Sequence, residues 1–370
     1  MSTERRKRRV VVAMSGGVDS STAAAMLCEQ GFDVVGVTLK LYDARGTAAS
    51  IGGRCCTPRD IEDARATAAR YGFPHYVLDE SEAFAKGVID DFVDAHRVGR
   101  TPNPCVRCNE KMKFGPLVAF ARSVGAEALA TGHYAQIEAG PEGVQLRRAV
   151  DREKDQAYFL FAVRPSLFSF VRFPLGHLTK PEVRREAQRL GLPNWDKADS
   201  HEICFIPDGN HKAFVEARGG AGKTGEIIDE TGRELGTHGG THHFTVGQRK
   251  GLPAVGGADR RFVLRIDPAT GKVFVGPRSD LGRPEIEVAD TRWLVPPPPN
   301  GDAFACDVQV RHHAKAHAAE VSVVDGVARV RFVTPVEGVS PGQAAVFFRD
   351  DVVLGGGWIE DFAALSRAAG

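Results

Sequence analysis

The chain has 370 residues, of which 42% are hydrophobic and 26% are charged, so it can bury a sizeable core and form two or three domains. Its formal net charge of +1 excludes a uniformly basic surface, so any nucleic acid would have to be bound through local basic patches. No apolar run approaches the roughly 20 residues of a membrane-spanning helix, so we expect no membrane partner. Seven cysteines without an apolar signal segment indicate a reducing cytoplasm.

The first part of the chain alternates short apolar runs with longer helical patterns. Strands are predicted for VVVAM at 10–14, FDVVGVTLKL at 32–41, HYVLD and GAEALATGHY, and the segments beginning STAAAM and PRDIED predict helices. The amphipathic KPEVRREAQRLGLP predicts a helix that ends at Gly191. This alternation is typical of an α/β fold in which a Rossmann-like parallel sheet carries helices on both faces.

After about Pro207 the sequence changes to short segments separated by glycines. The turns ETG and ATG predict two hairpins, and after LVPPPPNGD the segments FACDVQVR, AEVSVVDGVARVRFV and GQAAVFFRDDVVLGGGWI predict the strands of a β-barrel. We therefore predict three domains: an adenylating domain at 1–207, a small and mostly β central domain at 208–282, and a C-terminal β-barrel at 283–370.

The loop SGGVDSS follows the first predicted strand and leads into the first predicted helix. Glycines let a backbone approach a phosphate closely, the N–H groups of a helix start attract anions, and the hydroxyls of Ser15, Ser20 and Ser21 add hydrogen-bond donors. Asp19 is expected to cap the helix or to bind the Mg²⁺ that accompanies ATP. The loop lacks the Walker lysine and resembles the PP-loop of the N-type ATP pyrophosphatases, which implies ATP and Mg²⁺ as cofactors and transfer of AMP.

A second glycine-rich stretch, ARGGAGKT at 217–224, fits a loose Walker pattern. It follows a short predicted helix and precedes a predicted strand, which is the reverse of the strand-to-helix context that a phosphate-binding loop requires. We therefore interpret it as a loop leading into a hairpin.

Three cysteines are candidates for sulfur chemistry. Cys105 and Cys108, in TPNPCVRCNEKMKF, are expected in a turn just before a helix, where Arg107 and Lys111 would lower the pKa of a thiol. Cys204, in SHEICFIP, is expected in a loop between two domains, which suits a sulfur carrier. Alternatively, Cys55 and Cys56 could join Cys105 and Cys108 in a zinc or iron–sulfur site, although adjacent cysteines suit this poorly. Cys28 and Cys306 are expected to be packing residues.

Seven segments occur in the order and spacing found in the bacterial tRNA-specific 2-thiouridylases, and the chain resembles that family over nearly its whole length. The segments are SGGVDSS, TPNPCVRCNEKMKF, TGHY, KDQAYFLF, HEICFI, GQRKGL and SPGQAAVFF. The resemblance implies adenylation of O2 of the wobble uridine in the tRNAs for lysine, glutamate and glutamine, and replacement of this oxygen by sulfur from a cysteine persulfide. An upstream sulfur-relay protein would supply the sulfur.

The resemblance also implies a role for individual residues. Cys108 would be the nucleophilic cysteine and Cys204 the persulfide carrier, and no resident metal is implied. The ATP site would comprise Ala13, Met14, Ser15, Gly16, Gly17, Val18, Asp19, Ser20, Leu39 and Gly132. Residues expected to contact tRNA are Asn103, Pro104, Cys105, His133, Lys154, Asp155, Gln156, Arg311, His312 and Gln343.

The chain departs from the family at Cys105, where many members have aspartate. Cys105 could form a neutral wall of the base pocket, or it could be a third thiol that competes for disulfide formation with Cys108. Two other classes of function also stay open: another PP-loop enzyme, such as an amidotransferase-like synthetase or an iron–sulfur tRNA thiolase, and a non-catalytic RNA-binding protein with a zinc knuckle. Metal content and AMP release distinguish them.

Overall fold

The structure, a computed structural model, describes residues 7–42, 58–141, 143–199, 203–206, 208–253 and 260–360. These residues divide into two units. Unit 1 lies within Met1–Val88, Cys105–Gly209 and Asp351–Val353, and unit 2 lies within Ile89–Pro104, Asn210–Asp350 and Leu354–Gly370. The three domain ranges predicted from the sequence differ from this division and stay a prediction.

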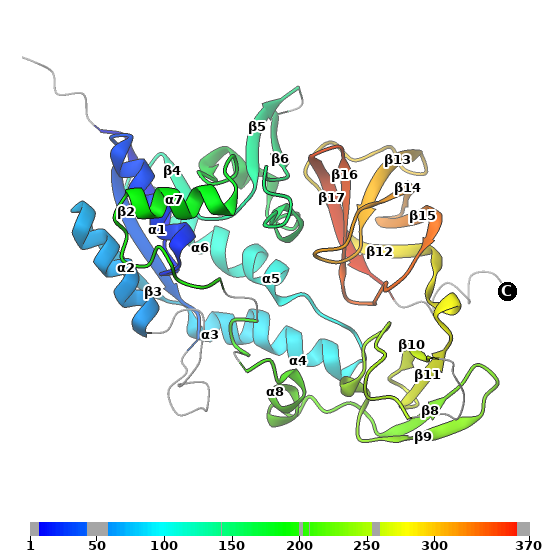
Figure 1. Ribbon diagram of the computed structural model, residues 1–370. Helices are drawn as coiled ribbons and strands as arrows, with labels where there is room; N and C mark the ends of the chain where they lie inside the picture. The colour runs from blue at the N-terminus through cyan, green and yellow to red at the C-terminus, as the bar shows by residue number, and fades with distance from the viewer. Residues whose placement is uncertain are drawn as a thin grey trace, which may run out of the picture. The chain divides into compact units, whose positions relative to one another are not determined.

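Unit 1 is built on a parallel sheet of five strands in the order β3-β2-β1-β4-β7 (Figure 1). The strands are β1 (Arg9–Ala13), β2 (Asp33–Lys40), β3 (His75–Asp79), β4 (Ala128–Thr131) and β7 (Val171–Arg172). The three central strands β1, β2 and β4 are almost wholly buried, as expected of strands whose two faces are both covered, whereas the edge strand β3 has no fully buried residue. The prediction of an α/β fold with a parallel sheet is confirmed.

Helices lie on both faces of this sheet. Val10 and Val12 of β1 pack with residues of α1 (Val18–Glu29) and α2 (Pro58–Tyr71) in one core cluster. Side chains alternate between the faces of a strand, so Val11 points to the other face, and α6 (Phe114–Ser123) contacts β1 and β4. The remaining helical segments of unit 1 are α3 (Ser81–Phe84), α5 (Pro104–Arg107, which belongs to unit 1 from Cys105 onward), the π-helical segment η3 (Cys108–Lys113), two 3-10 segments (Ala157–Phe159 and Pro165–Phe170) and α7 (Lys180–Arg189). The strands β5 (Gln136–Gly140) and β6 (Gly143–Arg147) form a hairpin.

Unit 2 contains the mostly β part of the chain. The hairpin β8–β9 (Gly225–Ile228 and Glu234–His238) turns at the predicted ETG, the hairpin β10–β11 (Phe262–Asp267 and Lys272–Gly276) turns at the predicted ATG, and β8 and β11 pair in parallel. The π-helical segment Ala85–Ile89 leads into α4 (Asp90–Arg97), which belongs to this unit, as do α8 (His211–Ala217) and the 3-10 segments η6 (Thr241–His243) and Arg278–Leu281. The stretch 218–224 lies between α8 and β8, as predicted for a loop leading into a hairpin.

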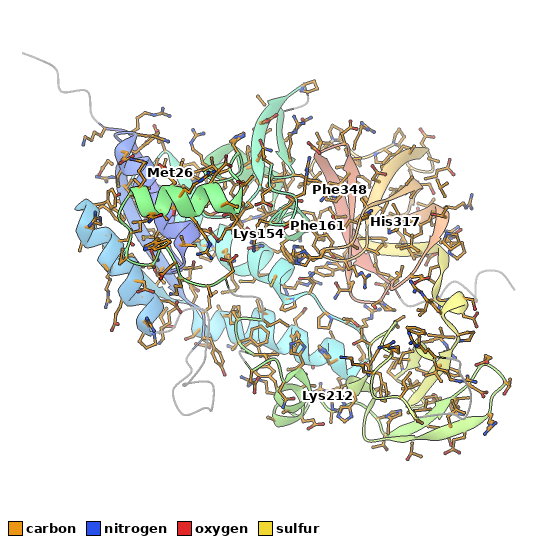
Figure 2. All side chains as sticks on the ribbon, viewed as in Figure 1. Met26, Lys154, Phe161, Lys212, His317 and Phe348 are labelled. Carbon is orange, nitrogen blue, oxygen red and sulfur yellow. The ribbon has the colours of Figure 1, made fainter. Side chains whose placement is uncertain are left out.

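Six strands close into a barrel in unit 2, in the order β12-β15-β14-β13-β16-β17 with β12 paired back to β17. They are β12 (Arg283–Trp293), β13 (Ala303–Gln309), β14 (His317–Val324), β15 (Val327–Val336), β16 (Ala344–Arg349) and β17 (Val352–Ile359). Closure leaves none of the six strands as a free edge. Phe347 and Phe348 of β16 are fully buried; Phe348 is labelled in Figure 2. Within the described residues, no helix combines the length and the apolar composition needed to cross a membrane.

Candidate active site at the end of the parallel sheet

The SGGVDSS loop connects β1 to α1 at the carboxyl edge of the sheet. Its backbone is anchored to β2, because the Met14 N–H donates to the Val37 carbonyl (2.8 Å) and the Thr38 hydroxyl donates to the Met14 carbonyl (2.8 Å). Within the loop, the Ser15 N–H donates to Oγ of Ser20 (3.1 Å). The first turn of α1 presents its N–H groups at this point, which is the geometry of an anion site.

Two glycines allow close backbone contacts around the loop. Gly16 has φ +71°, and a Cβ there would overlap the backbone carbonyl of Asp60 in α2. A Cβ on Gly132 would lie 2.8 Å from the Ser20 nitrogen. The structure therefore brings Gly132, which follows β4, against the start of α1.

The predicted ATP-site residues lie at the ends of three neighbouring strands. Ala13 ends β1 and pairs with Thr131, which ends β4, and Leu39 lies near the end of β2. The strand order reverses between β1 and β4, because β2 and β3 lie on one side of β1 and β4 and β7 on the other. Open parallel sheets bind their ligands at the carboxyl ends of strands at such a reversal.

The expectation that Asp19 caps α1 is wrong. The N-cap residue is Gly17, without a side-chain cap, whereas the Asp19 carboxylate accepts two bonds from Nζ of Lys180 (2.7 and 2.8 Å) and one from the Tyr134 hydroxyl (2.9 Å). Burial, with the neighbouring Asp19 charge, raises the pKa of Tyr134, so its hydroxyl stays protonated and donates. Lys180 also pairs with Asp199 (2.9 Å) and is itself buried.

The expectation that Ser21 presents its hydroxyl to a phosphate is also wrong. Ser21 is fully buried, and its Oγ accepts from Nδ2 of Asn194 (3.1 Å) and from the Thr67 hydroxyl (3.2 Å) of α2. Asn194 and Lys197 each donate to the Gly16 carbonyl at 3.1 Å. The segment after α7 therefore fixes the loop through hydrogen bonds to Gly16 and Ser21.

Asp199 is the centre of a charged network beside the loop. Besides Lys180 it pairs with Lys154 (2.7 Å), which is labelled in Figure 2, and with Arg184 (3.1 Å). Burial alone would raise the pKa of Asp199, but the hydrogen bonds from Lys154 and Lys180 outweigh it and lower the pKa to about 2. The carboxylate is therefore ionised throughout the physiological range.

This shift predicts a pH-dependent contribution to stability. A carboxyl whose pKa falls from about 3.9 in the unfolded chain to about 2 in the folded chain stabilises the fold above pH 4 and loses this contribution as the pH falls toward 2. Asp199→Asn should therefore lower the free energy of unfolding at pH 7, and its difference from wild type should shrink between pH 4 and pH 2. Denaturant titrations at several pH values measure this; the exposed Asp196→Asn is the control, and a difference that is constant with pH contradicts the prediction.

The predicted tRNA contacts of unit 1 lie in a buried or half-buried setting. His133 bonds to the Thr131 hydroxyl (2.8 Å) and lies between the rings of Phe114 and Phe173, at 5.8 and 5.9 Å. Burial, with some contribution from Lys113, holds the pKa of His133 well below its ordinary value. The ring is therefore neutral at pH 7, which suits stacking or hydrogen bonding to a base and not neutralisation of a phosphate.

Asp155 and Gln156 use their side chains within the fold. The buried Asp155 carboxylate accepts from Arg148 (2.9 Å) and from the backbone N–H groups of Ala149 and Ala157, and Oε1 of Gln156 accepts from the Tyr134 N–H (2.9 Å). Burial raises the pKa of Asp155 in spite of Arg148. In this structure both side chains position the loop that carries Lys154.

The expectation of a turn at Cys105 and Cys108 is wrong. Cys105 lies in α5 and Cys108 begins the π-helical segment η3, so both belong to a continuous helical stretch that starts at Pro104, where the missing N–H of proline costs no helical hydrogen bond. Cys105 is exposed and Cys108 is buried. The expected cationic neighbours have other partners: Arg107 pairs with Glu110 (2.9 Å), and Lys111 donates to the Gly87 carbonyl.

Cys204 is half-buried, next to the buried Phe205. The Phe205 ring packs edge-on against Phe84 of α3 at 5.8 Å, and α3 also contacts η3, which begins with Cys108. The structure thus places both cysteine-bearing segments against the same short helix. Cys55 and Cys56, the other proposed metal ligands, lie outside the described residues.

Cys28 and Cys306 behave as packing residues. Burial raises the pKa of Cys28 to about 11 and is the largest cause of the rise to about 12 at Cys306. Both therefore remain neutral thiols at neutral pH and are poor nucleophiles.

The remaining predicted tRNA residues lie in unit 2. Asn103 and Pro104 are buried, Arg311 is exposed and His312 is half-buried, with its ring 3.8 Å from that of His313. Nε2 of Gln343 donates to the carbonyls of residues 101 and 102.

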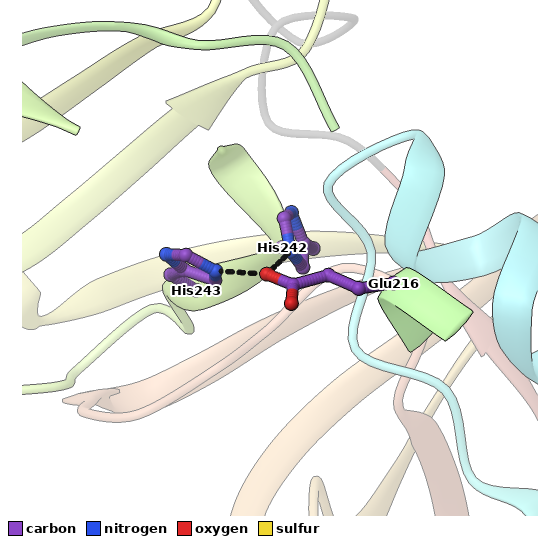
Figure 3. Close-up of side chains that lie close together, drawn as sticks. All are labelled: Glu216, His242 and His243. Atoms are coloured by element: carbon purple, nitrogen blue, oxygen red, sulfur yellow. Dashed lines mark hydrogen bonds and ion pairs between the residues drawn. The ribbon is translucent and has the colours of Figure 1, made fainter. Parts of the chain in front are cut away.

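Among the described residues, Glu216, His242 and His243 form a group whose ligand atoms lie close enough together to hold a metal ion (Figure 3). Nε2 of each histidine lies within hydrogen-bond distance of the same Glu216 oxygen, at 3.0 Å for His242 and 2.8 Å for His243. The Gly222 N–H donates to Nδ1 of His242, so Nε2 carries the proton. A metal bound at Nε2 would have to displace this proton and the Gly222 bond, so the arrangement fits a hydrogen-bonded cluster and not a metal site.

The residues that sequence reasoning missed are those that surround the loop: Lys180, Tyr134, Asn194, Lys197 and Asp199. One signal could have indicated Lys180. It occupies the first position of α7, directly after the N-cap Thr179 of the capping box that Glu182 completes, where the helix dipole disfavours a cation. A lysine at that position needs a local anion, and Asp19 and Asp199 supply two.

Comparison with known protein families agrees with this geometry. Residues 8–208 match the tRNA methyl transferase HUP domain, 212–277 the tRNA methyl transferase PRC-barrel domain, and 283–359 the aminomethyltransferase beta-barrel domain. The HUP match contains the whole SGGVDSS loop and all three candidate cysteines.

Curated relatives match over almost their full length, and three examples are each named tRNA-specific 2-thiouridylase MnmA. The protein of Rhodospirillum centenum is 50% identical over 365 residues, covering 95% of this chain and 91% of that protein. The Methylorubrum populi protein is 48% identical with 98% and 96% covered, and the Geobacter metallireducens protein is 46% identical with 97% and 98% covered. The chain therefore belongs to the tRNA-specific 2-thiouridylase family, a family of tRNA-modifying enzymes with a PP-loop ATP-binding domain.

Proposed function

We propose that this protein uses ATP to replace O2 of the wobble uridine with sulfur in the tRNAs for lysine, glutamate and glutamine. The observation that carries the proposal is the loop at the end of β1, with Gly132 packed against the start of α1, in a chain about half identical to 2-thiouridylases. The products are 2-thiouridine, AMP and pyrophosphate. The expected location is the cytoplasm, where tRNA and ATP are both present.

The loop would bind the phosphates of ATP. The N–H groups at the start of α1 and the exposed Ser15 hydroxyl would donate to phosphate oxygens, and the glycines allow close approach. Mg²⁺ would neutralise phosphate charge, and Asp19 is the carboxylate of the loop that suits it. Lys180 now bonds both Asp19 oxygens, so it would have to give up at least one of these bonds to a bound cation.

Sulfur transfer would follow adenylation. O2 of the uridine attacks the α-phosphorus and pyrophosphate leaves, which converts this oxygen into a leaving group. The terminal sulfur of a Cys204 persulfide then attacks C2, and AMP departs with the oxygen. The Cys108 thiolate attacks Sγ of Cys204, which releases 2-thiouridine and forms a Cys108–Cys204 disulfide.

The cycle also needs a sulfur donor and a reductant. A sulfur-relay protein would deliver the terminal sulfur to Cys204, and an external thiol reductant would reopen the disulfide. For the disulfide to form, the Cα atoms of Cys108 and Cys204 must come within about 7 Å in at least one state. Packing of both segments against α3 supports such an approach.

The test is ATP-dependent sulfur incorporation into tRNA. Unmodified tRNA transcripts, ATP, Mg²⁺ and a persulfide-charged donor are incubated with the protein, and thiolated product is detected by its retardation in a mercury-containing gel, with AMP measured in parallel. We expect retardation only with the three named tRNAs and only with ATP, and none when the wobble uridine is replaced by cytidine. AMP release without retardation under these conditions would overturn the thiolation and leave the adenylation.

A further inference from the structure

The peptide that joins Gly16 to Gly17 has little conformational restriction of its own. Glycine adopts positive and negative φ about equally readily, so a peptide between two glycines can turn over at little cost. This peptide is trans and planar, so its C=O and its N–H point in opposite directions. Whichever side the Gly16 carbonyl faces, the Gly17 N–H therefore faces the other.

Two side chains hold the Gly16 carbonyl in one orientation. Nδ2 of Asn194 and Nζ of Lys197 each donate to it at 3.1 Å, and they use both lone pairs of the carbonyl oxygen. The Gly16 backbone also packs so closely on Asp60 of α2 that a Cβ would overlap the Asp60 carbonyl. If the peptide turned over, both hydrogen bonds would be lost.

Lys197 uses all three of its hydrogens in this arrangement. Its Nζ donates to Oδ1 of Asp60 (2.8 Å), to Oδ2 of Asp63 (2.6 Å) and to the Gly16 carbonyl, and an ammonium group has three donors. Burial alone would lower the pKa of Lys197, but the hydrogen bonds to the two carboxylates outweigh it and raise the pKa. Lys197 is therefore charged at pH 7, and its charge is balanced within α2.

The Gly17 N–H belongs to the anion site at the start of α1. Gly17 is the N-cap of this helix, and the N–H groups at a helix start have no partner within the helix and attract anions. Apart from the chain neighbours of Gly17, a Cβ there would meet only Oγ of Ser15, at 3.5 Å, so there is space beside this residue for a ligand oxygen. In a turned-over peptide the Gly16 carbonyl oxygen would replace the N–H and repel a phosphate.

We propose that Lys197 is a positioning residue for ATP: with Asn194 it locks the Gly16–Gly17 peptide so that the N–H, and not the carbonyl oxygen, faces a phosphate. The residues that form this lock all lie in unit 1. The inference rests on the proposed function, since ATP is the ligand that the loop would bind. The role differs from a direct phosphate contact, because the three hydrogens of Lys197 are held by Gly16 and by the two carboxylates of α2.

The first test measures the Kd for ATP with Mg²⁺ by equilibrium dialysis. Lys197→Met keeps the length of the side chain and should raise this Kd by at least about tenfold, as for the loss of one hydrogen bond from a charged donor. Asn194→Ala changes no charge and should also raise the Kd. Arg9→Met is the matched control: Arg9 also pairs with a carboxylate (Asp33, 2.8 Å) and donates to a backbone carbonyl (Val124, 2.8 Å), but at the opposite end of β1, so the Kd should stay unchanged.

The second test separates positioning from electrostatics. Lys197→Met leaves the charges of Asp60 and Asp63 without their cation, which would itself repel a phosphate. The double variant Lys197→Met/Asp63→Asn has the net charge of the wild type and still lacks the bond to Gly16. A Kd that stays raised in the double variant supports the lock, whereas a Kd that returns to the wild-type value overturns it and makes the role electrostatic.

Turnover separates the positioning of ATP from a contact made during the reaction. In tRNA-dependent AMP formation, Lys197→Met should raise the KM for ATP and change kcat by no more than a few-fold. A fall in kcat with an unchanged KM would overturn the proposal and make Lys197 a contact of the reacting phosphate.

The remaining outcomes distinguish this inference from the proposed function. A normal Kd for ATP in both Lys197→Met and Asn194→Ala would overturn the inference alone, and absence of ATP binding by the wild type would overturn both. Melting curves show whether each variant is folded at the assay temperature. If Lys197→Met is not, Asn194→Ala decides the result.

Discussion

Cys204→Ser is expected to abolish sulfur incorporation into tRNA while tRNA-dependent formation of AMP and pyrophosphate continues. Serine cannot carry a persulfide, so no sulfur reaches C2, and water is left to attack the adenylated uridine. Removal of a covalent nucleophile typically costs about a thousandfold or more in rate. Retardation in the mercury gel should therefore fall below detection, whereas pyrophosphate release in a single turnover should stay within a few-fold of wild type.

In a single turnover without reductant, Cys108→Ser should also abolish retardation, for a different reason. The sulfur would remain linked to Cys204 through a disulfide to C2, and tRNA covalently bound to the protein should accumulate until a thiol reductant is added. Cys105→Ser is the matched control, because Cys105 is exposed and lies in the same helical stretch. It should retain thiolation if Cys105 only lines the base pocket.

A disulfide trap checks the cysteine pair directly. After turnover without reductant, peptide mass spectrometry should find Cys108 linked to Cys204 in the wild type and not in a reaction without ATP. Thiolation by Cys204→Ser, or a Cys105–Cys204 disulfide in place of the expected one, would contradict the assigned roles. The second result would make Cys105 the reacting thiol at the position where many relatives have aspartate.

The strands, the barrel and the phosphate loop could be predicted from the sequence because local patterns encode them. Val10 to Val12 form an uninterrupted apolar strand, and the glycines of the loop indicate a backbone conformation that other residues rarely adopt. The strand and the loop are each predicted from a few consecutive residues. The same holds for the two hairpins at their glycine turns.

The partners of the loop could not be predicted in this way, because they come from distant parts of the chain. Asp19 was expected to cap α1, but its carboxylate accepts hydrogen bonds from Lys180, which is 161 residues away in the sequence. Ser21 resembles a phosphate-binding hydroxyl in sequence, yet one helical residue after Ser20 it faces α2 and Asn194. Asp155 is expected from the resemblance to contact tRNA, and the structure has its carboxylate buried and bonded to Arg148.

The two loop glycines should respond very differently to alanine. Gly16→Ala places a Cβ in the Asp60 backbone at φ +71°, so the loop must move away from α2 and loses the bonds from Asn194 and Lys197 to the Gly16 carbonyl. A non-glycine residue in a left-handed conformation alone costs about 1–3 kcal/mol. We expect at least this loss in the free energy of unfolding, and loss of detectable ATP binding in equilibrium dialysis.

Gly17→Ala is the matched control for this effect. Its φ is −83°, and a Cβ would meet only Oγ of Ser15, at an ordinary contact distance of 3.5 Å. Its free energy of unfolding should therefore stay within about 1 kcal/mol of wild type, as for a substitution without a steric mechanism. If Gly16→Ala binds ATP normally, the loop is not held by α2 in the active protein. If Gly17→Ala is stable but loses ATP binding, the phosphate itself occupies the space beside Gly17, which is the close approach that a glycine at the start of α1 permits.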